Sequence, residues 1–228
     1  MIVGGSVPGL PTLDTLIADA SPELQPAATT RDDAAFWLYS SGSTGAPKGV
    51  VHLHSHLVNT AELYARPIIG IGPDDVVYSA AKLFFAYGLG NALTFPFRVG
   101  ATAIYMAERP TPASVARILR QHRPTIFCAV PTLYAAMLAS PDLPAKEELR
   151  LRRCISAGEA LPGATRKLFR EATGIEIIDG IGSTEMIHIF ISHRPDNARP
   201  GATGYAIPGY QATVLDENGR PCAPGQVG

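Results

Sequence analysis

The stretch TPASVARILRQHRPTIFCAVPTLYAAMLAS, residues 111–140, changes its hydrophobic period twice. Residues 111–122 have the spacing of a helix, with Pro112 near the helix start, where proline is well tolerated. Residues 125–130 are a short apolar run typical of a buried strand, and residues 131–140 return to a helical pattern. A buried strand between two helices predicts a parallel sheet covered by helices on both faces.

The same alternation continues on both sides of this stretch. It predicts an α/β fold, a doubly wound parallel sheet with helices on both faces. The further predicted strands are residues 36–40, 75–80, 101–106, 151–158 and 175–182. The further predicted helices are residues 55–68, 88–96 and 161–174, the last ending at Gly174, together with a short helix over 13–20.

The pattern changes after Pro200. Residues 209–221, GYQATVLDENGRP, are typical of a hairpin, with Asn218-Gly219 in the turn and Val214 and Leu215 in a strand. We therefore expect three parts: a lead-in over 1–35, an α/β core over 36–199, and the start of a small β-barrel unit over 200–228.

Composition and charge restrict the function. Charged residues are 17% of the 228 residues and the net charge is −1, which argues against nucleic acid as the main partner. The three cysteines form no CxxC pair, which fits a reducing cytosol better than a disulfide framework. The longest apolar run, 126–139, is interrupted by Pro131 and is too short for a bilayer. We expect a cytoplasmic protein with no membrane partner and leave its oligomeric state open.

A loop rich in glycine and hydroxyl side chains, YSSGSTGAPKGVV, spans residues 39–51. Glycines let successive N–H groups point into one anion-binding concavity, and Lys48 adds a cation that phosphate oxygens can pair with. Pro47 before the lysine and Gly49 after it depart from the P-loop NTPase pattern, which disfavours that class. Because the loop follows a predicted strand, we expect it at the carboxyl edge of the sheet.

Three motifs together carry a family resemblance. The string SSGSTGAPKG resembles the phosphate loop of the adenylate-forming (AMP-binding) superfamily, and GIGSTE, 180–185, resembles its second nucleotide motif, with Ile181 in place of the usual tyrosine. SAGEAL, 156–161, resembles the adenine-contacting turn. KLFFAYGLGN, 82–91, and IDGIGSTEMIHIF, 178–190, look most like the aryl-CoA ligase branch, the benzoate–CoA ligases and their 4-hydroxybenzoate relatives.

The resemblance implies an acid–thiol ligase of aromatic degradation that uses ATP, Mg²⁺ and coenzyme A. An aromatic carboxylate attacks the α-phosphate of ATP, and the thiol of coenzyme A then displaces AMP. It implies phosphate contacts from Ser41, Gly42, Ser43, Thr44, Gly45 and Lys48. It implies adenine contacts from Gly158, Glu159, Asp179, Gly180 and Ile181.

The catalytic residues implied by the resemblance are Lys48, Thr184 and Glu185. Thr184 would hydrogen-bond the α-phosphate, and Glu185 would bind Mg²⁺, a hard cation that prefers oxygen ligands. The implied acyl pocket is a flat slot with apolar walls, and it excludes long fatty acids by sterics. Its residues are Ala86, Tyr87, Ala157, Gly182, His188 and Ile189.

Several interpretations stay open. Glu159 could instead be an acidic residue at a helix start beside Pro162, and His188 could be a packed core histidine. His52, His54 and His56 alternate and would share one face on a strand, but no cysteine or acid cluster lies near them, which disfavours a metal site. The substrate could be 4-hydroxybenzoate or another aryl or acyl acid. The chain could also be a nucleotide-binding module without turnover.

The resemblance also implies parts that these residues do not include. Family members carry a mobile C-terminal lid whose lysine contacts the carboxylate and the α-phosphate, and lid closure excludes water. We therefore expect the 228-residue polypeptide alone to be inactive or nearly so. Detectable benzoyl-CoA formation by the purified polypeptide would contradict this expectation.

Overall fold

The computed structural model of the chain describes residues 3–18, 20–40, 45–199 and 201–228. By their contacts the residues form two units, 1–30 and 31–228. The first contains the predicted short helix, α1 (Leu13–Ala18), which buries none of its residues. The second contains every motif singled out above. The boundaries predicted near residues 35 and 199 stay predictions.

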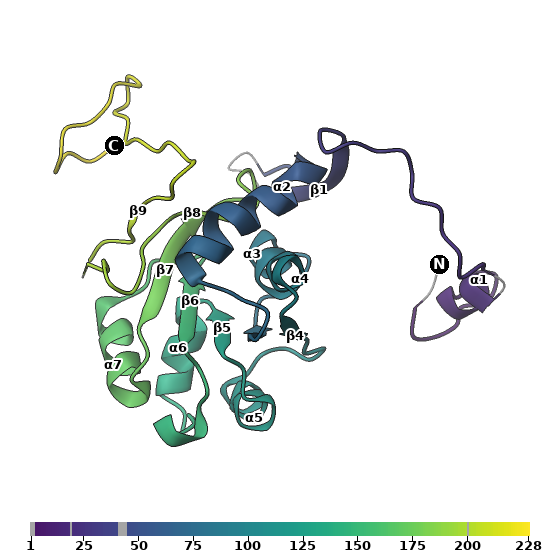
Figure 1. Cartoon of the computed structure of the whole chain (residues 1–228), viewed down its shortest axis with the longest axis horizontal. Helices are drawn as coiled ribbons and strands as arrows, with labels where there is room; N and C mark the ends of the chain where they lie inside the picture. Colours follow the sequence, from purple (N-terminus) through teal and green to yellow (C-terminus); the bar gives the residue numbers. More distant parts are fainter. Residues whose placement is uncertain (1–2, 19, 41–44, 200) are drawn as a thin grey trace. The chain divides into compact units, whose positions relative to one another are not determined.

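A mixed seven-stranded sheet organises the second unit (Figure 1). Its strand order is β4-β3-β5-β6-β7-β8-β9, in which β4 to β7 pair in parallel and β8 and β9 are antiparallel. The α/β fold class is confirmed, and no closed barrel is present in the described residues. The strands are β3 (Val76–Ser79), β4 (Thr102–Ile104), β5 (Ile126–Ala129), β6 (Arg153–Ala157), β7 (Ile177–Gly182), β8 (Ile189–Ser192) and β9 (Tyr205–Ala206).

Helices cover both faces of this sheet, as predicted. Along β5 the side chains alternate between two cores: Cys128 packs with the core under the helices before β4, and Phe127 packs with the core under the later helices. The first group is α2 (His54–Thr60), the π-helix η1 (Ala61–Ile69), α3 (Ala86–Leu89), the π-helix η2 (Gly90–Thr94) and α4 (Phe95–Val99). The second is α5 (Pro112–His122), α6 (Pro131–Leu138) and α7 (Gly163–Thr173), with a short 3₁₀ turn η3 (Lys146–Glu148).

The helical segment 86–99 runs past Pro96, where we predicted its end. Proline has no N–H to donate to the preceding turn, so a carbonyl there needs another partner. The hydroxyl of Tyr105 donates to the Ala92 carbonyl at 2.8 Å. This side-chain bond compensates for the missing backbone bond, and the helix continues to Val99.

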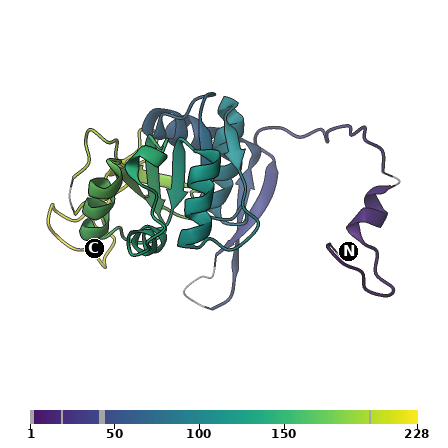
Figure 2. The same ribbon diagram turned by 90° about the horizontal axis from the view of Figure 1, so that it is seen from below.

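The reason for placing the glycine-rich loop at the carboxyl edge of the parallel sheet is wrong, and the placement itself stays a prediction. Strands β1 (Ala34–Ser40) and β2 (Lys48–Leu53) pair with each other as a separate antiparallel sheet and are not part of the parallel one (Figure 2). The loop therefore connects two hairpin strands instead of following a strand of the parallel sheet. A strand followed by a glycine-rich loop is common to both arrangements, so the local sequence could not separate them.

The C-terminal hairpin is confirmed in part. Gly219 adopts φ +74°, which glycine accepts without strain, and its N–H donates to the Asp216 carbonyl at 2.9 Å. Pairing is limited to an isolated bridge between Leu215 and Pro221. The predicted turn is present, but the predicted strand is reduced to this bridge.

A carboxylate network fixes the amino-terminal edge of the parallel sheet. Asp75 is 6% exposed and accepts hydrogen bonds from Arg152 Nε at 2.8 Å and from Thr125 Oγ1 at 2.6 Å. The Gly72 N–H also donates to it, at 2.9 Å. Burial raises the pKa of Asp75, but the hydrogen bonds outweigh burial and hold the pKa below its ordinary value.

We predict that Asp75→Asn lowers the free energy of unfolding by about 2 kcal/mol at neutral pH, because Arg152 and Thr125 lose a charged acceptor. The folded-state pKa is depressed, so this stabilisation is present above the usual aspartate pKa of about 3.9 and is lost as the pH falls below it. Urea unfolding from pH 7 to pH 3 measures both effects. The exposed neighbour provides the control, Asp74→Asn, and an equal effect of both substitutions would contradict the assignment.

Candidate active site

The second nucleotide motif, residues 180–185, begins in β7 and ends in the segment that joins β7 to β8. Ile187 has φ +60°, a strained value for a branched residue, and its N–H donates to the Thr184 carbonyl at 3.1 Å. The Thr184 side chain is half-buried and Glu185 is exposed. The turn thus presents a hydroxyl and a carboxylate at the carboxyl end of β7, the edge where ligands bind in open α/β sheets.

His52 ties this turn to the glycine-rich hairpin. Its side chain is fully buried on β2, and its Nε2 lies 2.9 Å from the Thr184 carbonyl oxygen. Burial lowers the pKa of His52, against the effect of this bond, so the ring is neutral at neutral pH. A carbonyl only accepts, so Nε2 carries the proton. Nδ1 lies 3.2 Å from His56 Nδ1, which accepts from the Leu53 N–H at 3.3 Å.

The three histidines do not share a face, because they do not lie on one strand. Strand β2 ends at Leu53, so His54 and His56 belong to α2 and only His52 points inward from the strand. No group of three or more His, Cys, Asp or Glu side chains among the described residues could hold a metal ion.

His188 lies within a cage of aromatic rings. Its ring centroid is 4.5 Å from that of Phe95, 5.3 Å from that of Tyr64 and 5.5 Å from that of Tyr87. Burial lowers the pKa of His188 to about 3, so the ring is neutral at physiological pH. Its Nε2 lies 3.3 Å from the Tyr87 carbonyl, while Nδ1 has no partner within the described ranges.

Two glycines let the backbone approach this cage. A Cβ at Gly90 would lie 2.4 Å from Cδ2 of His188, and a Cβ at Gly182 would lie 2.8 Å from its carbonyl oxygen. Ile189 is buried and covers Gly180, which pairs across the sheet with Ala157. The structure thus places five of the six predicted acyl-pocket residues around one another. Ala86, the sixth, is half-buried beside Tyr87 at the start of α3.

The predicted adenine residues lie at the ends of β6 and β7. Asp179 is 6% exposed, and burial raises the pKa of its carboxyl group. Its Oδ1 has no partner among the described residues and the residue lines a cleft of about 900 Å³ beside α7. Gly158 follows β6 with φ +89°, and Ile181 is 45% exposed.

Glu159 has a structural partner that neither interpretation anticipated. Its carboxylate accepts from Thr132 Oγ1 at 2.5 Å and from Thr132 N at 3.3 Å, at the first turn of α6. It is therefore an acid at a helix start, but of α6 and not of the helix beside Pro162. An acidic side chain is favourable at that end of the helix dipole.

The phosphate loop is described only at its two ends. Ser41, Gly42, Ser43 and Thr44 lie outside the described residues. Gly45 has φ +85°, and Lys48 is exposed at the start of β2, paired with Ser40.

The model of the AMP-binding enzyme family matches residues 6–228. The chain belongs to the AMP-binding enzyme family. The resemblance drawn from its three motifs is thereby confirmed. No helix in the described ranges is long and apolar enough to cross a membrane.

Two similar relatives within the family are aryl-CoA ligases. The chain is 58% identical to the benzoate–CoA ligase of Thauera aromatica over 96% of its own length and 41% of that protein. It is 47% identical to the 4-hydroxybenzoate–CoA/benzoate–CoA ligase of Rhodopseudomonas palustris, covering 42% of that protein. The chain thus spans about two fifths of the length of these relatives.

Solved structures agree with this placement. A benzoate CoA ligase from Burkholderia xenovorans LB400 has a TM-score of 0.90 and 55% identity, covering 97% of this chain and 44% of that one. The anthranilate CoA ligase AuaEII, solved in complex with anthranoyl-AMP, has a TM-score of 0.92 and 38% identity, covering 98% and 44%.

Sequence reasoning weighed His52 only as a metal ligand and missed its contact with the Thr184 carbonyl. The available signal was its place two residues after Val50 in an alternating strand, which puts both side chains on one face. Its partner is a backbone carbonyl 132 positions away, which no sequence pattern reveals.

We predict that His52→Leu lowers the free energy of unfolding by about 1–3 kcal/mol, because the Thr184 carbonyl loses its side-chain donor. His52→Gln keeps an N–H donor and should recover part of this loss. The control is His54→Ala, an exposed neighbour expected to stay within about 0.5 kcal/mol of the wild type. Urea unfolding monitored by circular dichroism measures the free energies of unfolding. If His52→Leu destabilised the protein no more than the control, the stabilising role of the His52–Thr184 contact would be refuted.

Proposed function

We propose that the chain forms the nucleotide- and acyl-binding part of an ATP-dependent aryl-CoA ligase, with benzoate as the acid. The observation that carries this proposal is 58% identity to a benzoate–CoA ligase over 96% of the chain. The reaction adenylates the carboxylate and then transfers the acyl group to the thiol of coenzyme A. Residues 36–199 would form the α/β core, and residues 200–228 would begin the β-rich unit.

The proposed adenine site lies where strands β6 and β7 end. Gly158 and Ile181 leave an exposed surface at the ends of β6 and β7 for the adenine, with the buried Gly180 beside Ile181 in β7. The unpartnered Oδ1 of Asp179 is an acceptor for the exocyclic amine of adenine. Glu159, the residue after Gly158, is held by its hydrogen bond from Thr132. The loop residues Ser41, Gly42, Ser43, Thr44, Gly45 and Lys48 would hold the β- and γ-phosphates.

Charge develops on phosphate oxygens in both steps, and fixed donors stabilise it best. The Thr184 hydroxyl is the proposed donor to the α-phosphate, and His52 fixes the backbone that carries it. Lys48 supplies the positive charge on the pyrophosphate side.

One exposed carboxylate, that of Glu185, fits a magnesium ion that takes its remaining ligands from phosphates and water. When bound, this ion would neutralise phosphate charge. A single-carboxylate site agrees with the lack of an all-protein metal cluster in the described residues.

The acyl pocket is proposed to hold the aromatic ring between Tyr87, Ala157, Gly182 and Ile189, with Ala86 at the start of α3. A neutral His188 closes the deep end. Its free Nδ1 could pair with a ring hydroxyl, and this atom favours 4-hydroxybenzoate as the second candidate acid. A site that hydrogen-bonds a substrate hydroxyl discriminates strongly against the analogue that lacks it.

We predict that the chain binds a non-reactive benzoyl-AMP analogue and that Thr184→Val weakens this binding about tenfold or more, because a hydrogen bond to a charged group is lost. The affinity for adenosine, which has no phosphate, should stay unchanged. Isothermal titration calorimetry measures both ligands.

The neighbouring hydroxyl provides the matched control, Ser183→Ala, which should leave the affinity for the analogue near the wild-type value. Release of phosphate from ATP without any carboxylate would indicate an NTPase and refute the proposal. Equal binding of ATP with no preference for the analogue would favour a nucleotide-binding module without turnover.

A further inference from the structure

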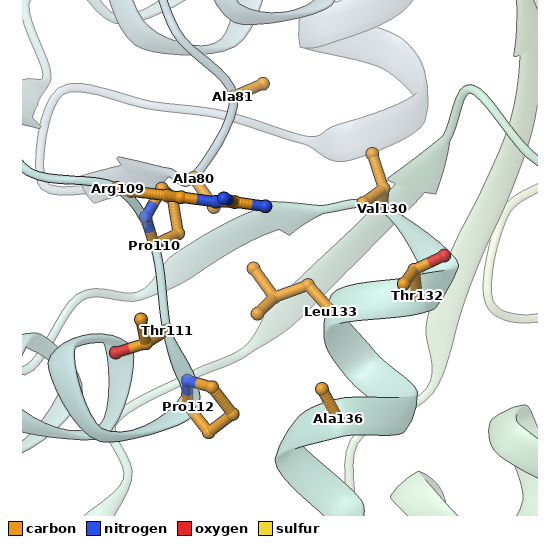
Figure 3. A pocket seen from close by; sticks show the side chains of 10 residues that line it. All are labelled: Ala80, Ala81, Arg109, Pro110, Thr111, Pro112, Val130, Thr132, Leu133 and Ala136. Atoms are coloured by element: carbon orange, nitrogen blue, oxygen red, sulfur yellow. The ribbon is translucent and has the colours of Figure 1, made fainter.

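A second cleft lies at the carboxyl edge of the parallel sheet, on the face opposite to the one that His188 packs against. It has a volume of about 560 Å³ and is formed where β3 and β5 end, between the start of α5 and the first turns of α6 (Figure 3). The acyl-pocket side chains Tyr87 and Ile189 pack with the core on the other face. The lining residues are Ala80, Ala81, Arg109, Pro110, Thr111, Pro112, Val130, Thr132, Leu133 and Ala136.

The cleft combines an apolar wall with one cation. Leu133 and Ala136 of α6 face Pro110 and Pro112 across it, and the guanidinium of Arg109 extends toward Val130 (Figure 3). The Arg109 side chain is exposed and has no hydrogen-bond or ion-pair partner within the described ranges. Guanidinium is planar, pairs with carboxylates through two parallel hydrogen bonds and stacks on aromatic rings.

The segment that carries Arg109 is fixed on both sides. Before it, Lys82 Nζ donates to the carbonyls of Met106, Ala107 and Glu108 at 2.6, 3.1 and 2.7 Å. After it, the Thr111 hydroxyl accepts from Ser114 N at 3.2 Å and caps α5. The position of Arg109 is therefore set by its neighbours, without a partner of its own.

Nearby acidic side chains are already occupied. The carboxylate of Glu108 pairs with Arg117, and that of Glu159 accepts from both Thr132 groups. Arg109 thus stays available as a cation at the mouth of an apolar cleft. The complementary occupant has a flat apolar body and one anionic group.

We propose that this cleft is a second binding site for an aromatic carboxylate, separate from the acyl pocket. The choice of an aromatic acid rests on the proposed function, while the requirement for an apolar anion rests on the cleft. The ring packs on Leu133, Pro110 and Pro112, and the carboxylate pairs with Arg109. Because the cleft opens at the ligand-binding edge of the sheet, it can hold the acid before or during turnover.

Isothermal titration and methyl NMR of the full chain with benzoate, in the presence of a saturating benzoyl-AMP analogue, test the proposal. We expect benzoate to bind despite the analogue and to shift the Ala136 and Leu133 methyl signals. Arg109→Met should lower the benzoate affinity about tenfold or more. Arg109→Lys should lower it by less, because lysine keeps the charge but not the two parallel N–H donors of the guanidinium. Ala136→Leu should fill the cleft and also weaken binding.

Arg150→Met is the matched control, because Arg150 is an exposed arginine without a partner in the described part of the chain. Equal affinities of Arg109→Met and Arg150→Met would overturn the proposal, as would complete displacement of benzoate by the analogue. The proposal would also be overturned if the cleft bound phosphopantetheine through Arg109 but did not bind benzoate. If the analogue itself fails to bind, the proposed function is contradicted, and the same titration on the free protein decides the cleft.

Discussion

The structure depends on the burial of strand β5 from both sides. Phe127 and Cys128 are fully buried in opposite cores, so neither helical layer can shift without exposing apolar surface. Because β3, β5, β6 and β7 run in parallel, this central strand places the ends of all four at one edge. The 560 Å³ cleft and the β7–β8 turn belong to that edge. The cleft is lined by Ala80 and Val130, which directly follow β3 and β5.

Which structural features could be predicted from the sequence depended on whether the deciding interactions are local. The parallel core was predictable, because apolar runs such as residues 125–130 and the helices beside them reflect burial along a continuous segment. The motif residues near Thr184 were predictable because they are local. The hairpin β1–β2 and the helix that continues past Pro96 were not. A strand before a glycine-rich loop occurs both in hairpins and in parallel sheets, and the donor to the Ala92 carbonyl, Tyr105, lies outside the helix. The Tyr105 hydroxyl donates to the carbonyl that Pro96 leaves without a backbone donor, and no pattern around Pro96 predicts this contact.

The same limit explains the two histidines. His52 and His188 were both visible as residues, but their environments arise from several elements that meet only in the folded chain. His52 lies between β2, α2 and the β7–β8 turn, and His188 lies between rings of Tyr64, Tyr87 and Phe95. Burial makes both rings neutral, so each acts through hydrogen-bond direction and shape, not through charge.

Some of the buried polar atoms without partners in the described residues lie near this edge. In the described residues, Oδ1 of Asp179, Oγ of Ser156 and Nδ1 of His188 are buried and unpaired, and Ser156 lies opposite Asp179 in the register of β6 and β7. Leaving one such group unpaired costs about 1–3 kcal/mol, and a stable core has little reason to gather several. At the amino-terminal edge, by contrast, Asp75 has donors on every side. The unpaired atoms at the carboxyl edge are groups whose hydrogen bonds a ligand or an ordered water can complete, and at the amino-terminal edge Arg153 Nε is also buried and unpaired among the described residues.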